Sequence, residues 1–63
     1  MPNLMRNMGQ PVEIWTRDGR VHRGVMDGAD PPRGVFMRDR FGRRRFFAFV
    51  FIAAFFVRRR RIF

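Results

Sequence analysis

The side chains that could perform catalysis are few in this 63-residue chain. It contains no Ser, Cys, Lys or Tyr; Thr16 is its only hydroxyl and His22 its only imidazole. Nucleophilic catalysis requires a nucleophile beside a base that activates it, and these residues cannot supply such a pair. Among the carboxylates, Asp18 and Asp27 resemble turn residues and Glu13 a strand surface residue, so a catalytic role is not expected. We therefore expect neither enzyme activity nor a cofactor, and a lone histidine without cysteine cannot form the usual four-ligand zinc site.

Arginine is the abundant functional group. Fourteen arginines against five acidic residues give the chain a net charge of +9. An excess of this size on a small domain favours partners that carry phosphate or other acidic groups. The alternative is a solubilising surface on a strongly apolar chain. Half of the arginines lie in two runs, residues 43–45 and 58–61, which bracket an apolar segment.

Ten residues are predicted to contact nucleic acid or another polyanion, because guanidinium groups neutralise phosphates and exposed aromatic rings stack on bases. Each has a plainer structural interpretation. Residues 58–61 could be a frayed basic tail and residues 43–45 a solvated turn, and the aromatic residues could pack under the N-terminal segment or a neighbouring subunit. His22 is interpreted as a surface strand residue. The predicted contacts are Arg33, Arg43, Arg44, Arg45, Arg58, Arg59, Arg60, Arg61, Trp15 and Phe41.

A β-hairpin is predicted near the start of the chain. Residues 12–17 alternate between two faces with the period of a half-buried strand, which places Trp15 on the outward register. Asp18-Gly19 follows, a dipeptide typical of a two-residue type I′ turn. The second strand covers residues 20–28, and Gly24 within it predicts a bulge or a sharp bend.

The remaining elements follow from turn residues and apolar runs. Pro2 favours one or two helical turns that end at Gly9, over residues 2–8. Two prolines make residues 29–34 a loop. Strands are predicted over residues 35–40, 44–52 and 56–62, joined by a hairpin connection at residues 41–43 and a short turn near residues 53–54.

The apolar segment at residues 46–57 predicts self-association. As a helix it would span ~18 Å, well short of the ~30 Å hydrocarbon core of a bilayer, so membrane association is not expected. A strand that is apolar on both faces must be covered on both. A chain of this length buries only ~60% of its unfolded surface, and without cysteine it has no disulfide to stabilise it. A buried strand at an oligomer interface is therefore predicted, with contacts through Phe47, Phe49, Phe51 and Phe56.

The order of these elements resembles the Sm-like (LSm/Hfq) family of small SH3-like barrels. The similarity rests on Gly9, Val12, Ile14, the Asp18-Gly19 turn, Gly24, Val25 and Asp30. It implies a ring, commonly of six or seven subunits, in which strand four pairs with strand five of the next subunit, and it implies RNA binding around that ring. Where Sm proteins place an Asn soon after the strand-two Asp, this chain has Pro31, Pro32, Arg33 and Gly34, and residues 53–55 stand in place of the Lys-His motif.

We therefore expect an all-β protein: one five-stranded SH3-like (Sm-like) barrel over residues 1–63, with a short N-terminal helix, that assembles into a homo-oligomeric ring. It would lie in the cytoplasm and bind RNA or another polyanion, mainly through backbone phosphates. The alternative is a non-enzymatic structural or protein-interaction module, for example a small assembly protein of a spore-forming bacterium.

Overall fold

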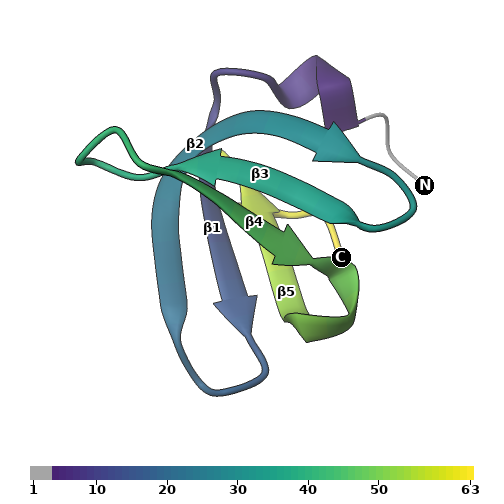
Figure 1. Ribbon diagram of the computed structural model, residues 1–63. Coiled ribbons are helices and arrows are strands. Elements are labelled where there is room, and N and C mark those ends of the chain that lie inside the picture. Colours follow the sequence, from purple (N-terminus) through teal and green to yellow (C-terminus); the bar gives the residue numbers. More distant parts are fainter. Residues whose placement is uncertain (1–3) are drawn as a thin grey trace.

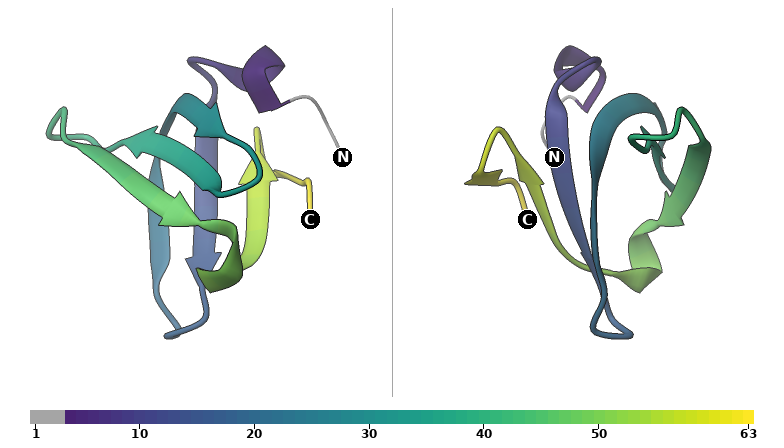
Figure 2. Two further views of the ribbon diagram at one scale, coloured as in Figure 1. Left: turned by 45° about the vertical axis from the view of Figure 1, so that its right-hand side comes forward. Right: turned by 90° about the vertical axis from the view of Figure 1, so that its left-hand side faces the viewer.

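The structure is a computed structural model that describes residues 4–63. Over that range the chain is all-β, as predicted, but it has six antiparallel strands and not the predicted five, and they form one open sheet in the order β4-β3-β2-β1-β5-β6. The sheet curls so that one of its faces encloses the core (Figures 1 and 2). The elements are η1 (Leu4–Asn7), β1 (Pro11–Thr16), β2 (Val21–Asp30), β3 (Gly34–Arg38), β4 (Arg44–Ala48), η2 (Phe49–Phe51), β5 (Ile52–Val57) and β6 (Arg60–Arg61), where η denotes a short 3-10 helix.

The core is made of strand residues that alternate between two faces of the sheet. In β1, Val12 and Ile14 are buried, whereas Glu13 and Trp15 lie on the outer face. The other strands supply the rest of one apolar cluster, although the alternation in β5 is broken by a register shift between Ile52 and Ala54. Its buried members are Val12, Ile14, Met26, Val35, Met37, Phe47, Ile52, Phe55 and Val57.

The turn between β1 and β2 differs from the predicted type I′ turn. The Gly19 N–H donates to the Thr16 carbonyl (3.0 Å) and the Thr16 N–H donates to the Arg20 carbonyl (2.9 Å). Within this turn only Gly19 has a positive φ, +86°, so residues 16–19 form a type I turn whose last residue is a left-handed glycine. The loop is one residue longer than predicted, and Glu13 consequently pairs with Arg23 across the hairpin.

The β3–β4 hairpin repeats this geometry. The Gly42 N–H donates to the Asp39 carbonyl, the Asp39 N–H donates to the Arg43 carbonyl, and Gly42 has a φ of +79°. The predicted left-handed glycine is therefore present, and the connection comprises residues 40–42, one position earlier than predicted.

The bend in β2 has two sources. The register shifts between Met26 and Gly28, so the bulged residue is Asp27; of the bulge or sharp bend predicted at Gly24, the bulge is not found there. Gly24 serves a different purpose, because a Cβ there would overlap the carbonyl oxygen of Arg38 on the neighbouring strand. The bulge and this close approach let β2 pair with both β1 and β3 while the sheet curls.

The apolar segment is divided between two strands. The predicted strand over residues 44–52 ends at Ala48, and η2 reverses the chain there, so Ala53 and Ala54 lie inside β5 and do not form the predicted turn. This arrangement lets Phe47 and Ile52 enter the same core from opposite directions. The predicted strand over residues 56–62 is also interrupted, because the chain turns at residues 58–59 before β6.

The N-terminal segment forms a single 3-10 turn, η1, inside the range 2–8 where helical turns were predicted; residues 2 and 3 lie outside the described residues. Gly9 follows with a φ of +77°, and its N–H donates to the Met26 carbonyl at 2.9 Å. Over residues 4–63 no helix is long and apolar enough to span a bilayer.

Replacing Gly19 with Val should destabilise the protein by about 1–2 kcal/mol, because a β-branched residue is disfavoured at positive φ. No atom lies within 4 Å of the position that a Cβ would occupy, so the loss would come from backbone conformation alone. Gly19→Asn is the matched control, since Asn tolerates the left-handed region, and it should lose much less. Thermal unfolding measures both, and equal melting temperatures for the two variants would contradict the turn assignment.

Candidate nucleic-acid interface

All five carboxylates already have hydrogen-bonding or ionic partners. Four of them pair with arginines, as Arg20–Asp18 (3.6 Å), Arg23–Glu13 (2.8 Å), Arg33–Asp30 (3.8 Å), and Arg38 and Arg44 with Asp27. The fifth, Asp39, accepts the backbone N–H groups of Phe41 and Arg43. Among the described residues, nine arginines make no ion pair with a carboxylate: Arg6, Arg17, Arg40, Arg43, Arg45, Arg58, Arg59, Arg60 and Arg61.

Asp27 connects three strands. The bulge in β2 places its carboxylate within 3.1 Å of the Arg38 Nη2 atom and 2.9 Å of the Arg44 Nε atom. The Arg44 guanidinium also lies 3.9 Å from the centre of the Phe36 ring. Arg44 therefore has a structural role in holding β4 against β2 and β3, although it was predicted to contact nucleic acid.

The tip of the β3–β4 hairpin presents an exposed aromatic ring between arginines. Phe41 is 71% exposed, and the guanidinium carbons of Arg40 and Arg43 lie 4.9 and 6.0 Å from its ring centre. Hydrogen bonds from the backbone of Arg43 and Phe41 lower the pKa of Asp39, which caps this turn as an ionised group. Arg40 was missed by sequence analysis because it stands alone, outside the arginine run.

Beside this tip is a hollow of about 500 Å³ that includes Arg45 and His22. The Arg45 guanidinium lies 5.6 Å from the Phe47 ring centre, and the His22 ring packs 4.9 Å from the same ring. The His22 Nε2 atom is 3.2 Å from the Thr16 hydroxyl. Burial, followed by the charge of Arg45, lowers the pKa of His22, so the imidazole stays neutral at physiological pH.

The C-terminal arginines begin in an unfavourable backbone conformation. Arg58 and Arg59 have φ values of 52° and 67°, and Val57 pairs with Arg60, so residues 57–60 form a two-residue hairpin turn of the type I′ class. Non-glycine residues in the left-handed region cost roughly 1–2 kcal/mol each. The turn keeps all four arginines exposed, in contrast to a continuous strand, which would direct two of them inward.

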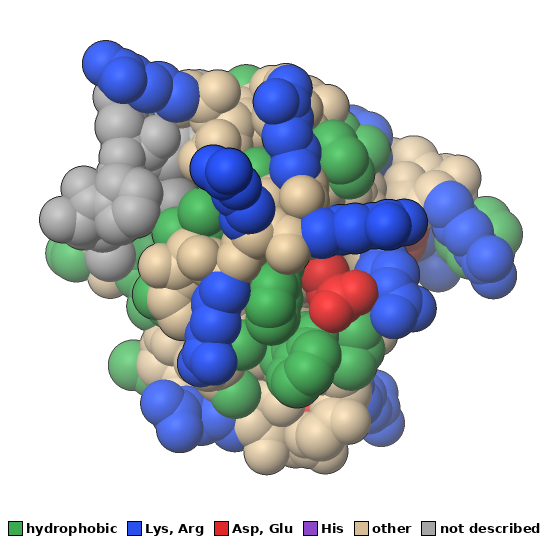
Figure 3. Space-filling model, turned by 180° about the vertical axis from the view of Figure 1, so that it is seen from behind, with side chains coloured by type: hydrophobic (Ala, Val, Ile, Leu, Met, Phe, Trp, Pro, Cys, Tyr) green, Lys and Arg blue, Asp and Glu red, His purple; other side chains and the backbone are tan. Residues whose placement is uncertain are grey.

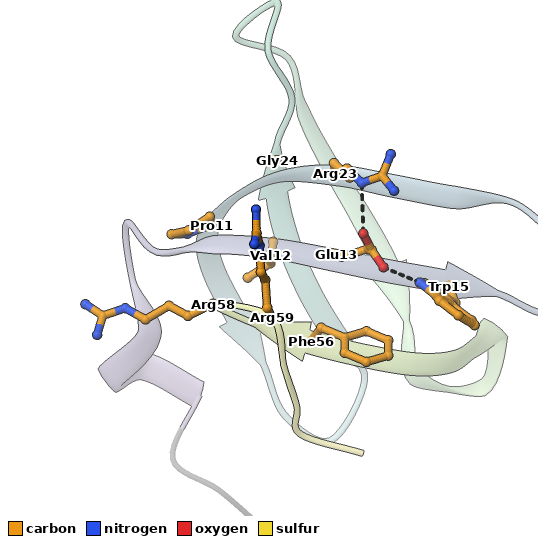
Figure 4. Close-up of a pocket in the computed structure, with 9 residues that line it drawn as sticks. All are labelled: Pro11, Val12, Glu13, Trp15, Arg23, Gly24, Phe56, Arg58 and Arg59. Carbon is orange, nitrogen blue, oxygen red and sulfur yellow. Dashed lines mark hydrogen bonds and ion pairs between the residues drawn. The ribbon is translucent and has the colours of Figure 1, made fainter.

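Arg59 lies at a groove of about 710 Å³ on the outer face of β1 and β5. Figure 4 shows Arg59 lying across β1 over Val12, with the Trp15 and Phe56 rings on the other side of the groove. Arg58 points away from it and donates to the Gln10 side chain. Three of the predicted contacts, Trp15, Arg58 and Arg59, therefore line the groove, although the Arg58 guanidinium is directed away from it.

A carboxylate lies within this groove. Glu13 accepts hydrogen bonds from the Trp15 indole N–H and from the Arg23 Nε–H, and these two bonds lower its pKa. Sequence analysis took Glu13 for an ordinary strand surface residue. The face seen from behind shows an acidic patch beside apolar side chains, with arginines around them (Figure 3).

The two arginine runs do not form one continuous site. Residues 43–45 belong to the hairpin next to β4, at one end of the strand order, and residues 58–61 adjoin β6 at the other end. Arg33 lies apart from both, in the β2–β3 turn beside Asp30. Among the described residues, no cluster of three His, Asp or Glu side chains is suited to hold a metal ion.

The residues predicted for an oligomer interface occupy different environments. Phe47 is only 7% exposed and belongs to the core, while Phe49 packs against that core and lies 5.8 Å from the Phe63 ring. Phe56 lies in the groove beside Trp15, at a ring-centre distance of 5.3 Å. Phe51 is 64% exposed and, with its equally exposed neighbour Val50, is available for contact with another chain.

The lowered pKa of His22 predicts a loss of stability in mild acid. The unfolded chain protonates near pH 6.5, the ordinary value for histidine, whereas the folded chain resists protonation. The stabilisation is therefore complete above about pH 6.5 and declines as the pH falls toward the lower, folded pKa. Thermal unfolding between about pH 7.5 and 5.5 should show this decline, and His22→Gln, which keeps a polar group near Thr16, should reduce it. Identical pH profiles for the two proteins would exclude His22 as the cause.

The geometry thus provides a basic aromatic hairpin tip, a strained arginine turn and a groove that joins an aromatic wall to a carboxylate. Comparison of the chain with protein-family models, with curated proteins and with solved structures finds no match.

Proposed function

We propose that this protein is a non-enzymatic module that binds single-stranded nucleic acid, or a similar polyanion, through its unmatched arginines. The observation that carries the proposal is the charge distribution. Every carboxylate is engaged, while nine arginines make no ion pair with one, so the surface has a large surplus of available positive charge among the described residues. Exposed aromatic rings accompany that charge at Phe41 and Trp15. This combination suits a strand whose phosphates and unpaired bases are both accessible.

The conformation of Arg58 and Arg59 supports the same proposal. Asn-Gly would fit a type I′ turn with little strain, whereas two arginines are held there at positive φ. Strained positions of this kind concentrate at functional sites, because stability alone would favour other residues. Asn-Gly would lack the positive charge of the two guanidinium groups, so we infer that this charge is the reason for arginine at these positions.

We further propose that the curled sheet is a small barrel of the Sm-like kind. The first five of the six antiparallel strands, with a 3-10 turn between β4 and β5, support this assignment. The ring that the resemblance implies would join β4 to β5 of the next subunit. In this structure Phe55 exchanges backbone hydrogen bonds with Ile62 and Phe63, and β6 pairs with β5, so residues 60–63 would have to move before such a ring could close.

Replacing Arg58-Arg59 with Asn-Gly should separate binding from stability. The turn would lose its strain, so the free energy of unfolding should rise by on the order of 1–2 kcal/mol, which means several degrees in Tm for a domain of this size. Binding to single-stranded RNA should weaken, and the slope of log affinity against log salt should flatten by ~0.7 for each phosphate that the variant no longer neutralises.

The matched control is the double variant Arg20→Gln and Arg33→Gln, which removes the same charge from arginines already paired with Asp18 and Asp30. It should flatten the salt slope less than the turn variant does. Absence of RNA and DNA binding by the unmodified protein at low salt would refute the proposed function.

A second candidate function is self-assembly or protein interaction, which the exposed edge of the sheet favours. β4 lies at the end of the strand order, so one of its edges has no strand beside it among the described residues. Phe46, Val50 and Phe51, on or directly after β4, are 45, 72 and 64% exposed. An open strand edge next to exposed apolar side chains is a template for pairing with another chain.

Phe51→Arg should therefore abolish self-association and leave the fold intact, because Phe51 lies outside the buried core. Light scattering at micromolar concentration should show an oligomer for the unmodified protein and a single subunit for the variant. Phe41→Arg is the control, since Phe41 is equally exposed but lies at the far hairpin tip, and it should remain associated. A stable monomer of the unmodified chain would refute this candidate.

A further inference from the structure

The groove on the outer face of β1 has the components of a site for a flat, polar ring. Trp15 is 44% exposed and packs against Phe56 with an angle of 43° between the rings, which forms an aromatic wall. Arg59 approaches from the opposite side, as the close-up shows (Figure 4). The groove volume of about 710 Å³ lies within the range of ~300–1,000 Å³ that is usual for small-ligand pockets. A planar group that enters between the wall and the guanidinium can stack on either side.

Glu13 gives the groove a directional polar group. One oxygen of its carboxylate accepts from the Trp15 indole and the other from Arg23. An ionised carboxylate has about four acceptor positions, so each oxygen retains one for a ligand. The Glu13 side chain is 27% exposed and can be reached from solvent. The two fixed donors orient the carboxylate, which leaves a pair of adjacent acceptors for a ligand.

We infer that this groove binds one unpaired guanine base of a single-stranded nucleic acid, with the base stacked against Trp15 and its N1–H and N2–H groups donating to Glu13. This inference rests on the proposed function and specifies the ligand of one part of the surface. Arg59, which lines the groove and makes no ion pair with a carboxylate, neutralises the adjacent phosphate.

The carboxylate selects guanine because of the pattern on the Watson–Crick edge, which single-stranded bases leave accessible. Guanine presents two adjacent donors there. Adenine and cytosine each combine one donor with an acceptor, and uracil places its donor between two carbonyl acceptors, which a carboxylate repels. Two adjacent acceptors in the protein therefore match guanine alone among the four common bases.

Trp15 itself provides the readout. It is the only tryptophan in a chain without tyrosine, so intrinsic fluorescence reports on the groove directly. The RNA UUGUU should quench this fluorescence and bind about tenfold more tightly than UUAUU, UUCUU or UUUUU, the discrimination typical of a bidentate contact to a base. The inosine analogue, which lacks the N2 amino group, should bind with intermediate affinity.

Glu13→Gln provides a change of specificity. A glutamine amide offers one acceptor and one donor, the pattern that complements adenine and cytosine, so this variant should lose the preference for UUGUU and gain affinity for UUAUU and UUCUU. Thermal unfolding checks that the variant is folded. If the variant does not fold, the comparison of the four RNAs on the unmodified protein still tests the inference.

The fluorescence anisotropy of labelled RNA, which measures binding to any part of the protein, distinguishes the proposed polyanion binding from the proposed guanine site. Binding that is equal for all bases and leaves Trp15 fluorescence unchanged would overturn the guanine site while the proposed polyanion binding stands. Failure of every RNA to bind at low salt would overturn both.

Discussion

The sharp curvature of β2 is the constraint on which the rest of this structure depends. A chain of 63 residues can enclose an apolar core with one sheet only if that sheet curls strongly. β2 supplies the curl because it pairs with β1 through its first half and with β3 through its second half. The bulge at Asp27 marks the change, and the close approach of Gly24 to the Arg38 carbonyl leaves no room for a side chain. The same bulge aims Asp27 at Arg38 and Arg44, so the bend is fixed by charge as well as by packing.

The charges of the protein divide into those that hold the fold and those that face outward. Arg38 and Arg44 connect strands through Asp27, and Arg23 orients Glu13. Exposed ion pairs of this kind contribute little individually to stability, typically ~0–1 kcal/mol, so the fold does not depend on a large number of arginines. The surplus and the strained turn at Arg58 and Arg59 are the two observations that support the proposed partner with negative charge.

Local alternation was enough to predict much of β1 and the outward position of Trp15, because Val12 and Ile14 repeat with the period of a strand. The type of the following turn was not predictable from Asp18-Gly19, which suits both a two-residue and a three-residue loop. The one additional residue in the loop shifts the strand register, so that Glu13 pairs with Arg23 and not with Gly24. The role of the Glu13 carboxylate in the groove was therefore not predictable from the sequence. The chain reversal at η2 was also not predictable from the sequence, because residues 46–57 are apolar throughout and contain no residue typical of turns. The position of the reversal is set by tertiary packing, because it places both Phe47 and Ile52 in the same core.

The pairing of residues 60–63 along β5 gives the protein an unequal pair of sheet edges. One edge is formed by β6, which has only two residues, and the other by the five-residue β4; neither has a further strand beside it among the described residues. β4 therefore offers more backbone for pairing with another chain than the short β6 does. Joining two β4 edges around a two-fold axis uses up both, so growth through β4 ends at a pair, whereas rings and fibres need a second, different edge on every copy. In the proposed self-association, the short β6 would favour pairing through β4, and displacement of residues 60–63 would expose β5 as a second, longer edge.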